Sequence, residues 1–284
     1  MVQRFGALVV KLVALLFSVI AHAQTATDFG ALPRMALVVS NAQFGGRLLP
    51  SSANNAKAMA DALAVAGFSV QRETDLTSAQ FENVVTHFSR RAAQARAFSV
   101  VYLAGMGTTV GDSIRFFVST EKPTVSQEDV YRDSTALAWV LAEMAVYRRA
   151  AGSSAPIALV ADIDTRLWGT AEDVQLPNVE AAYGALQREP RSMVMLPNVL
   201  GMSARLTDDS KYGLFTKHLA EAFPTRGADI GQLFGKAAVA VRREAKRPAE
   251  PELIVKGLEI QKTVFLPAEL TDDPKARGRS ARVM

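Results

Sequence analysis

The sequence predicts an α/β fold, with a mostly parallel central sheet of about six strands and helices on both faces. Two observations predict it. Short β-rich apolar runs alternate along the chain with longer segments of helical periodicity. The runs are apolar almost without interruption, which is typical of strands covered on both faces rather than of strands with one wet face.

The first half of the chain supplies three of the strands. Segment 34–40 (RMALVVS) is expected to be a buried strand. Helix 51–67 follows, with Ser and Asn as capping candidates and Gly67 as its C-terminal stop. The next elements are expected, in order, to be a strand over 68–74, a helix over 77–95 and a strand over 97–105. The stretch YLAGMGTTVG (102–111) is interpreted as the end of that strand and a tight glycine turn, where α/β enzymes often present a catalytic side chain.

The second half continues the alternation. A short hairpin is predicted over 112–120, and a surface connection with one short helix near 179–187 over 165–191. The remaining elements are expected to be helices over 134–151, 212–223 and 229–246, and strands over 156–164, 192–199 and 258–267.

Residues 1–23 are predicted to be a secretory signal. Arg4 provides a positive start, Leu12–Ile20 an apolar run, and Ala21-His22-Ala23 a small-x-small cleavage site. The run is too short for a membrane span, which needs roughly 20 residues; an uncleaved N-terminal anchor is the alternative. The expected organisation is signal 1–23, linker 24–33, one domain over 34–267 and a disordered basic tail over 268–284. Export to the periplasm or the extracellular space follows, with no membrane contact after cleavage.

Composition narrows the possible functions. The formal charge of +4 falls to about +2 without Arg4 and Lys11, which does not favour a nucleic-acid partner. There is no cysteine in the 284 residues. This excludes a disulfide, a thiolate nucleophile and a cysteine metal site.

Two strand ends carry the distinctive residues: Gly105-Met106-Gly107 after the third strand and Asp162-Ile163-Asp164 after the fourth. Ligands of parallel sheets bind beyond the carboxyl ends of strands. If these strands are neighbours, the two segments lie within reach of one another.

Four stretches in this order resemble one family. They are RMALVVSNAQFGGRLLPSSANNAKAMADALAVAGFSV, VVYLAGMGTTVGDSIRFFVSTE, IALVADIDTR and SKYGLFTKHLAEAF. They are similar to segments of the caspase-like peptidases of clan CD (family C14), particularly the bacterial orthocaspase and metacaspase-like branch. The resemblance covers roughly residues 34–265 and implies a caspase-like three-layer sandwich.

The resemblance also implies where chemistry has been lost. The family uses a His–Cys dyad; Met106 stands at the histidine position and Asp164 at the cysteine position. The family's basic-specific members line their specificity pocket with acids, and Asp162 matches one of these, with Asp208 or Asp209 in the segment of a second. The implied function is a pseudoprotease that binds a peptide or protein, with a basic side chain favoured. The alternatives are exposed loop acids with no pocket, and a purely structural remnant.

A different chemistry remains open for the paired aspartates. Asp162 and Asp164 resemble the DxD of haloacid-dehalogenase phosphatases, which predicts a metal-dependent hydrolase as the alternative function; Arg166 replaces the threonine of that motif. His87 and His218 are expected at helix surfaces or boundaries, with no zinc-binding spacing. Ser119–Lys122 matches S-x-x-K, a pattern easily met by chance. No cofactor and no metal are predicted, and the sequence does not define the oligomeric state.

Overall fold

The computed structural model describes residues 29–44, 47–118, 126–164, 178–198, 211–246 and 248–268. Its main sheet has the strand order β10-β9-β8-β5-β1-β4. These strands are β1 (Arg34–Ser40), β4 (Ser69–Thr74), β5 (Phe98–Val110), β8 (Ile157–Asp164), β9 (Ser192–Leu196) and β10 (Glu252–Lys256). All neighbours are parallel except β10 and β9. The predicted fold class is therefore confirmed.

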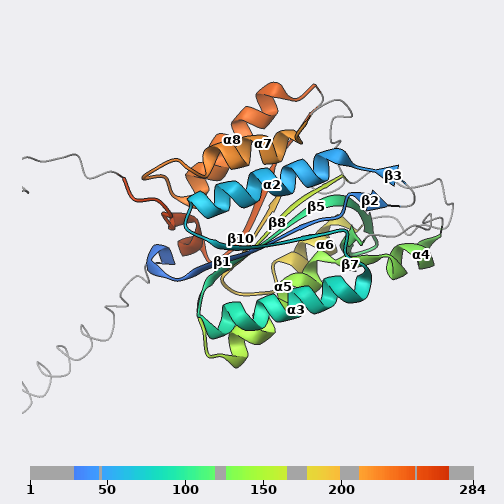
Figure 1. The fold of residues 1–284 in the computed structure, drawn as a ribbon, viewed down its shortest axis with the longest axis horizontal. Coiled ribbons are helices and arrows are strands. Elements are labelled where there is room, and N and C mark those ends of the chain that lie inside the picture. The colour runs from blue at the N-terminus through green and yellow to red at the C-terminus, as the bar shows by residue number, and fades with distance from the viewer. Residues whose placement is uncertain are drawn as a thin grey trace, which may run out of the picture.

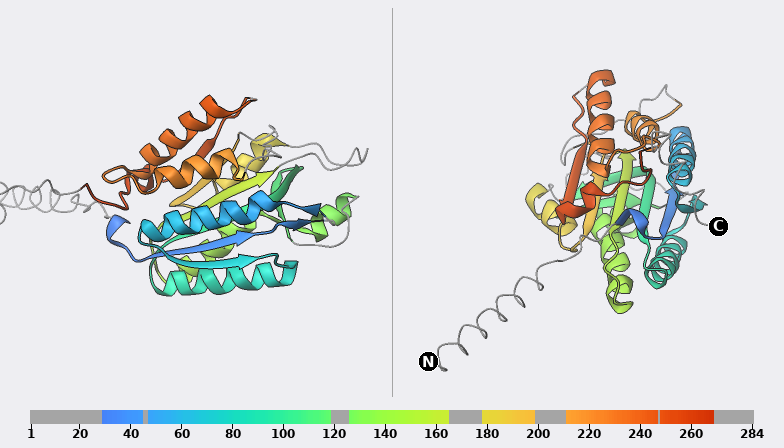
Figure 2. Two further views of the ribbon diagram at one scale, coloured as in Figure 1. Left: turned by 45° about the horizontal axis from the view of Figure 1, so that its top comes forward. Right: turned by 90° about the vertical axis from the view of Figure 1, so that its left-hand side faces the viewer.

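Helices cover both faces of this sheet, giving three layers (Figures 1 and 2). One face carries α2 (Pro50–Val65), α7 (Leu214–Ala222) and α8 (Ile230–Glu244), and the other carries α3 (Ser78–Gln94), α5 (Leu137–Ala150) and α6 (Val179–Leu186). Alternate strand residues enter different cores: Val38 packs on the α2 side, and Leu37 and Val39 on the α3 side. This two-sided burial explains why the strands are apolar at every position.

Small elements stand at the carboxyl end of the strands. The end of β5 pairs antiparallel with β6 (Ser113–Phe117), which pairs with β7 (Ser134–Ala136). The other short elements are β2 (Gln43–Phe44), β3 (Arg47–Leu48), α4 (Gln127–Arg132), η1 (Phe29–Ala31) and η2 (Leu258–Lys262). The hairpin expected after the third strand is thus present. None of the helices in the described ranges combines the length and apolar character that crossing a membrane requires.

Three local predictions were wrong. The strand expected over 258–267 is a 3₁₀ helix over 258–262. The edge strand, β10, precedes it and ends at Lys256, and Gly257 joins the two with a φ of 108°. Helix α2 begins with Pro50 after Leu49 and has no side-chain cap, because Ser52 and Asn55 contact the sheet instead. The first three residues of the helix expected over 134–151 form β7, against β6.

The chain ends of the domain pack into the α2-side core. Phe29 lies within the predicted linker 24–33 and is buried there, as is Phe265 near the other end. Phe265 contacts the rings of Phe68 and Phe98 edge-on. The predicted signal 1–23, residues 269–284 of the predicted tail and residues 165–177 of the predicted connection lie outside the described residues.

Candidate functional site

The two distinctive strand ends lie side by side. Strands β5 and β8 are parallel neighbours, with Ala104 opposite Asp162 and Met106 opposite Asp164. Met106 and Asp164 thus occupy directly paired positions at the carboxyl end of the sheet, where ligands of α/β proteins bind. Because β5 and β8 are neighbouring strands, the segments Gly105–Gly107 and Asp162–Asp164 lie side by side.

The glycines around Met106 do not form the tight turn that the sequence suggested. Strand β5 continues through them to Val110, and the turn comes at Gly111 and Asp112. A Cβ on Gly105 would lie 2.8 Å from the Asn41 carbonyl oxygen, and one on Gly107 would lie 2.7 Å from Ile163 Cδ1. Both glycines are required by close packing, so they mark crowding at this position rather than a reversal of the chain.

Met106 is a core residue. Its exposed fraction is 3%, and it packs in a small apolar cluster with Val110, Phe117 and Val130, against which Leu49 also lies. A flexible thioether suits such an irregular gap. The side chain at the family's histidine position therefore joins β5 to β6 and α4 by apolar contact and is not presented to solvent.

Asp162 is the centre of a buried polar network. Its exposed fraction is 2%. Its carboxylate accepts hydrogen bonds from Asn55 Nδ2 (3.0 Å) and from Thr216 Oγ1 (2.5 Å). Thr216 Oγ1 also lies 2.5 Å from the Tyr102 hydroxyl. The network thus ties β8 to β5, α2 and α7 through the interior.

The same network fixes the chain before α7. Asn55 Oδ1 accepts a hydrogen bond of 2.9 Å from the backbone N–H of Gly213, the residue that caps the N-terminus of α7. Beside it, Ser52 Oγ donates to the Ala104 carbonyl at 2.7 Å. Ser52 and Asn55 are both fully buried. Helix α2 therefore uses polar side chains where it crosses the ends of β5 and β8.

Burial perturbs the one phenol of this network. It raises the pKa of Tyr102 well above its ordinary value, and the charge of Asp162 raises this pKa further. The phenol thus stays protonated and acts as a hydrogen-bond donor. Donors surround the Asp162 carboxylate, an arrangement suited to holding a buried charge in place.

Of the other sequence-predicted residues, the structure describes His87 and His218 alone. Asp208, Asp209 and Ser119–Lys122 lie outside the described residues. His87 is exposed on α3. His218 is 8% exposed on α7, with Nδ1 3.1 Å from Glu221 Oε2 and Nε2 2.8 Å from Glu244 Oε2. Within the described ranges, no group of three or more His, Cys, Asp or Glu residues is placed to hold a metal ion.

Sequence reasoning missed Asn55, Thr216 and Tyr102. Their signal was present: Asn55 precedes Ala56 on the apolar face of a predicted helix, and Thr216 follows Phe215 on another. A polar residue on such a face must find a buried partner. That partner is defined only by the tertiary structure.

Comparison with known families agrees with this architecture. The fold defines the class of protein as an α/β sandwich with a mostly parallel central sheet. Residues 33–139 match the caspase domain of peptidase family C14, which confirms the caspase-like resemblance over this part of the chain. The matched segment runs from β1 into α5, so it includes Met106 and ends before β8. A search of curated proteins found no match.

Proposed function

We propose that this chain is an exported caspase-fold pseudoprotease that acts by binding a peptide or protein partner. One observation supports it above the others: Met106 and Asp164 are paired across β5 and β8, and the resemblance assigns the family's histidine and cysteine to these two positions. The chain contains no cysteine, so no thiol elsewhere in it can serve as the nucleophile.

The chemistry of the replacements argues against peptide cleavage. Cleavage by the family's route needs a thiolate to attack the carbonyl, a base, and an acid that protonates the leaving amine. Methionine carries no exchangeable proton, and a carboxylate attacks amides poorly. Removing the triad of a serine protease leaves only about 10³–10⁴-fold catalysis over water. A chain lacking both dyad members is therefore expected to show no turnover above this residual level.

The direct test is hydrolysis of fluorogenic peptides with basic or acidic residues before the scissile bond. The purified chain is expected to release no fluorophore beyond a control with Asp164→Ala. Turnover by the unchanged chain that Asp164→Ala or Asp162→Asn abolishes would contradict the proposal. The Asp164 control is informative because it lies at the former nucleophile position.

A metal-dependent hydrolase based on Asp162 and Asp164 is less well supported. The Asp162 carboxylate is buried and already accepts hydrogen bonds from Asn55 and Thr216. Both donors bond to the same oxygen, Oδ2, so a divalent cation at this oxygen would have to displace them. Calorimetric titration with Mg²⁺, together with turnover of a phosphate ester, tests this alternative; heat of binding that Asp162→Asn removes would revive it.

Export is the remaining part of the proposal. It rests on the pattern of residues 1–23, and Ala23 is the expected last residue of the signal. Expression of the full chain in bacteria, followed by fractionation and N-terminal sequencing, is expected to yield a secreted or periplasmic product beginning at Gln24. A product that retains Met1 and sediments with membranes would favour the uncleaved anchor.

A further inference from the structure

One edge of the main sheet is open in the part of the chain that the structure describes. Strand β4 is the last in the strand order and pairs there with β1 alone. Helix α2 packs on one face of β4. An edge strand with unpaired backbone groups is a template for another strand.

The register shows which backbone groups face outward. The N–H of Asp75 donates to the Ser40 carbonyl of β1 at 2.9 Å. Since backbone groups alternate in direction along a strand, those of Gln71 and Glu73 also face β1, and those of Val70, Arg72 and Thr74 face away from the sheet. Three successive pairs of donors and acceptors are therefore presented along this edge.

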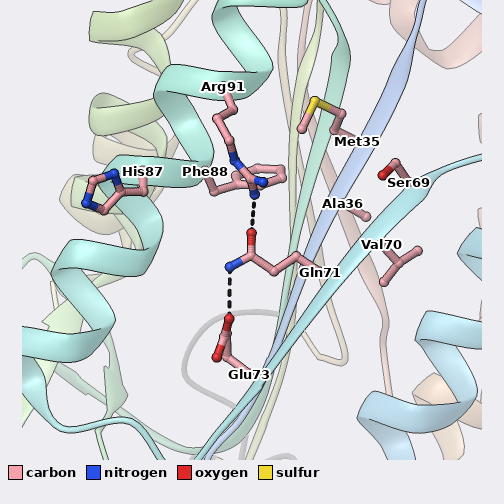
Figure 3. A pocket seen from close by; sticks show the side chains of 9 residues that line it. All are labelled: Met35, Ala36, Ser69, Val70, Gln71, Glu73, His87, Phe88 and Arg91. Carbon is pink, nitrogen blue, oxygen red and sulfur yellow. Dashed lines mark hydrogen bonds between the residues drawn. The ribbon is translucent and has the colours of Figure 1, made fainter.

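A groove runs beside the same edge, between β4 and α3 (Figure 3). It has a volume of about 390 Å³. Its walls include Gln71 and Glu73 from β4 and His87, Phe88 and Arg91 from α3.

Strand β4 and the residues that line the groove carry two arginines and one carboxylate, which favours an acidic ligand: Arg91 and Glu73 line the groove, and Arg72 belongs to β4. Arg91 donates to Gln71 Oε1, and Gln71 Nε2 donates to Glu73 Oε1 at 2.8 Å, as Figure 3 shows. Gln71 thus provides a hydrogen bond to the Glu73 carboxylate, which is the one carboxylate among the residues that line the groove. Arg91 and Arg72 are both exposed, and successive strand residues alternate between faces, so Arg72 lies on the face opposite Gln71. A guanidinium is thus available on each face of the edge.

We propose that the edge of β4 binds an extended acidic segment of a partner protein, which adds a strand to the sheet. Backbone hydrogen bonds to Val70 and Arg72 hold the segment, and carboxylates at adjacent positions, which a strand places on opposite faces, pair with Arg91 on one face and Arg72 on the other. This inference rests on the proposed binding function and names the surface and the partner chemistry. The partner proposed here is acidic and binds at an exposed edge, whereas the family resemblance implies a basic partner at Asp162, which is buried.

The probes are two fluorescent ten-residue peptides in which pairs of adjacent Glu, or pairs of adjacent Lys, are separated by Val, so that a strand carries charge on both faces. Fluorescence anisotropy with the full chain is expected to give at least about tenfold tighter binding of the Glu peptide. Equal affinity for both peptides would overturn the charge argument. Raising the salt from about 50 to about 500 mM is expected to weaken the Glu peptide's binding, because exposed charges are screened.

Substitutions at Arg72 separate the backbone from the side chain. Arg72→Pro removes an outward N–H without removing a bond to β1, and edge strands tolerate proline in this orientation. Arg72→Ala removes the charge but keeps the N–H. Arg72→Pro is expected to bind the Glu peptide at least about tenfold more weakly than Arg72→Ala. Identical binding by the two variants would exclude strand addition at this edge.

A second pair of variants does not depend on the folding of Arg72→Pro. Arg91→Glu is expected to weaken Glu-peptide binding about tenfold, whereas Arg243→Glu is expected to leave it unchanged. Both arginines lie in the last turn of a helix, α3 and α8 respectively, so the two reversals disturb their helices alike. Equal effects of the two reversals would overturn the proposal. If all four variants bind the peptide as the unchanged chain does, the β4 edge is not the binding surface, although the proposed binding function stands. Cleavage of the peptide would instead refute the proposal that the chain is a pseudoprotease.

Discussion

Replacing Asp162 by alanine is expected to destabilise the domain substantially, although the resemblance places this residue in a specificity pocket. The substitution leaves two buried donors, Asn55 Nδ2 and Thr216 Oγ1, without their acceptor. A hydrogen bond to a charged group contributes about 1.5–3 kcal/mol. Two such bonds give an upper limit of about 6 kcal/mol, and Thr216 keeps the Tyr102 hydroxyl as a neighbour, so we expect a loss of about 3 kcal/mol.

The assay is thermal unfolding followed by circular dichroism. For a domain of this size, 1 kcal/mol shifts the Tm by about 2–4 °C, so Asp162→Ala is expected to lower it by about 6–12 °C. The matched control is Asp61→Ala on the surface of α2, where a carboxylate pairs with Lys57 at a side-chain exposure of 62%. An exposed pair of this kind contributes about 0.5 kcal/mol or less, so the control Tm is expected to change little.

The result that refutes this reasoning is an Asp162→Ala variant as stable as its Asp61→Ala control. An aspartate that lines a ligand pocket is expected to behave in that way, because its removal relieves an unpaired charge. Because Asp162 is buried, charge reversal at this position cannot test peptide binding. A lysine there would unfold the domain whether or not the protein binds peptides, so loss of binding by that variant would carry no information.

Three further predictions concern the same end of the sheet. Met106→His is expected to lower the free energy of unfolding by about 2–4 kcal/mol, because an imidazole enters an apolar cluster, whereas Met106→Leu is expected to lower it by under about 1.5 kcal/mol. Equal midpoints of urea unfolding for the two variants would show that the side chain at this position contacts solvent. Gly107→Ala is expected to cost about 3 kcal/mol, since the new Cβ meets the Arg115 carbonyl at 2.8 Å, whereas Gly235→Ala, in open space on α8, stabilises by about 0.5–1 kcal/mol; a stable Gly107→Ala would contradict the crowding. Burial raises the pKa of Tyr102 in the folded state, so the stability that its protonated form contributes is complete below the unfolded pKa near 10 and falls by about 1.4 kcal/mol per pH unit above it. Urea unfolding of Tyr102→Phe between about pH 9 and 11 is expected to show no such fall in the free energy of unfolding. The same fall in this variant would exclude Tyr102 as its source.

Strands covered on both faces were predictable from the sequence because burial of every residue is visible in their composition. Strand β1 begins and ends at the predicted residues, Arg34 and Ser40. The error over 258–267 has the opposite origin. Ile260 and Phe265 are buried, as their apolar character suggests, but they belong to a 3₁₀ turn and an irregular segment. Apolar residues report burial, and over so short a run they do not determine the backbone conformation.

The site was predictable in position but not in contacts. The order of strand ends placed Met106 near Asp164, because it depends only on topology, and the register confirms that pairing. The glycines at 105 and 107 misled, since a glycine signals a turn and a close approach equally well. The neighbours that crowd them are distant in the sequence and were invisible to local reasoning: Asn41, with its carbonyl, directly follows β1, and Ile163 belongs to β8.

The surroundings of Met106 and Asp162 explain why we propose a partner surface on another part of the sheet. Open α/β sheets bind ligands beyond the carboxyl ends of their strands. In this chain Met106 fills that end with an apolar cluster, and Asp162 is enclosed by Asn55 and Thr216. At this end of β5 and β8, the described side chains of Met106 and Asp162 are thus engaged with other side chains of the protein. The open backbone of β4 is instead the surface on which we propose that the same sheet recognises another chain.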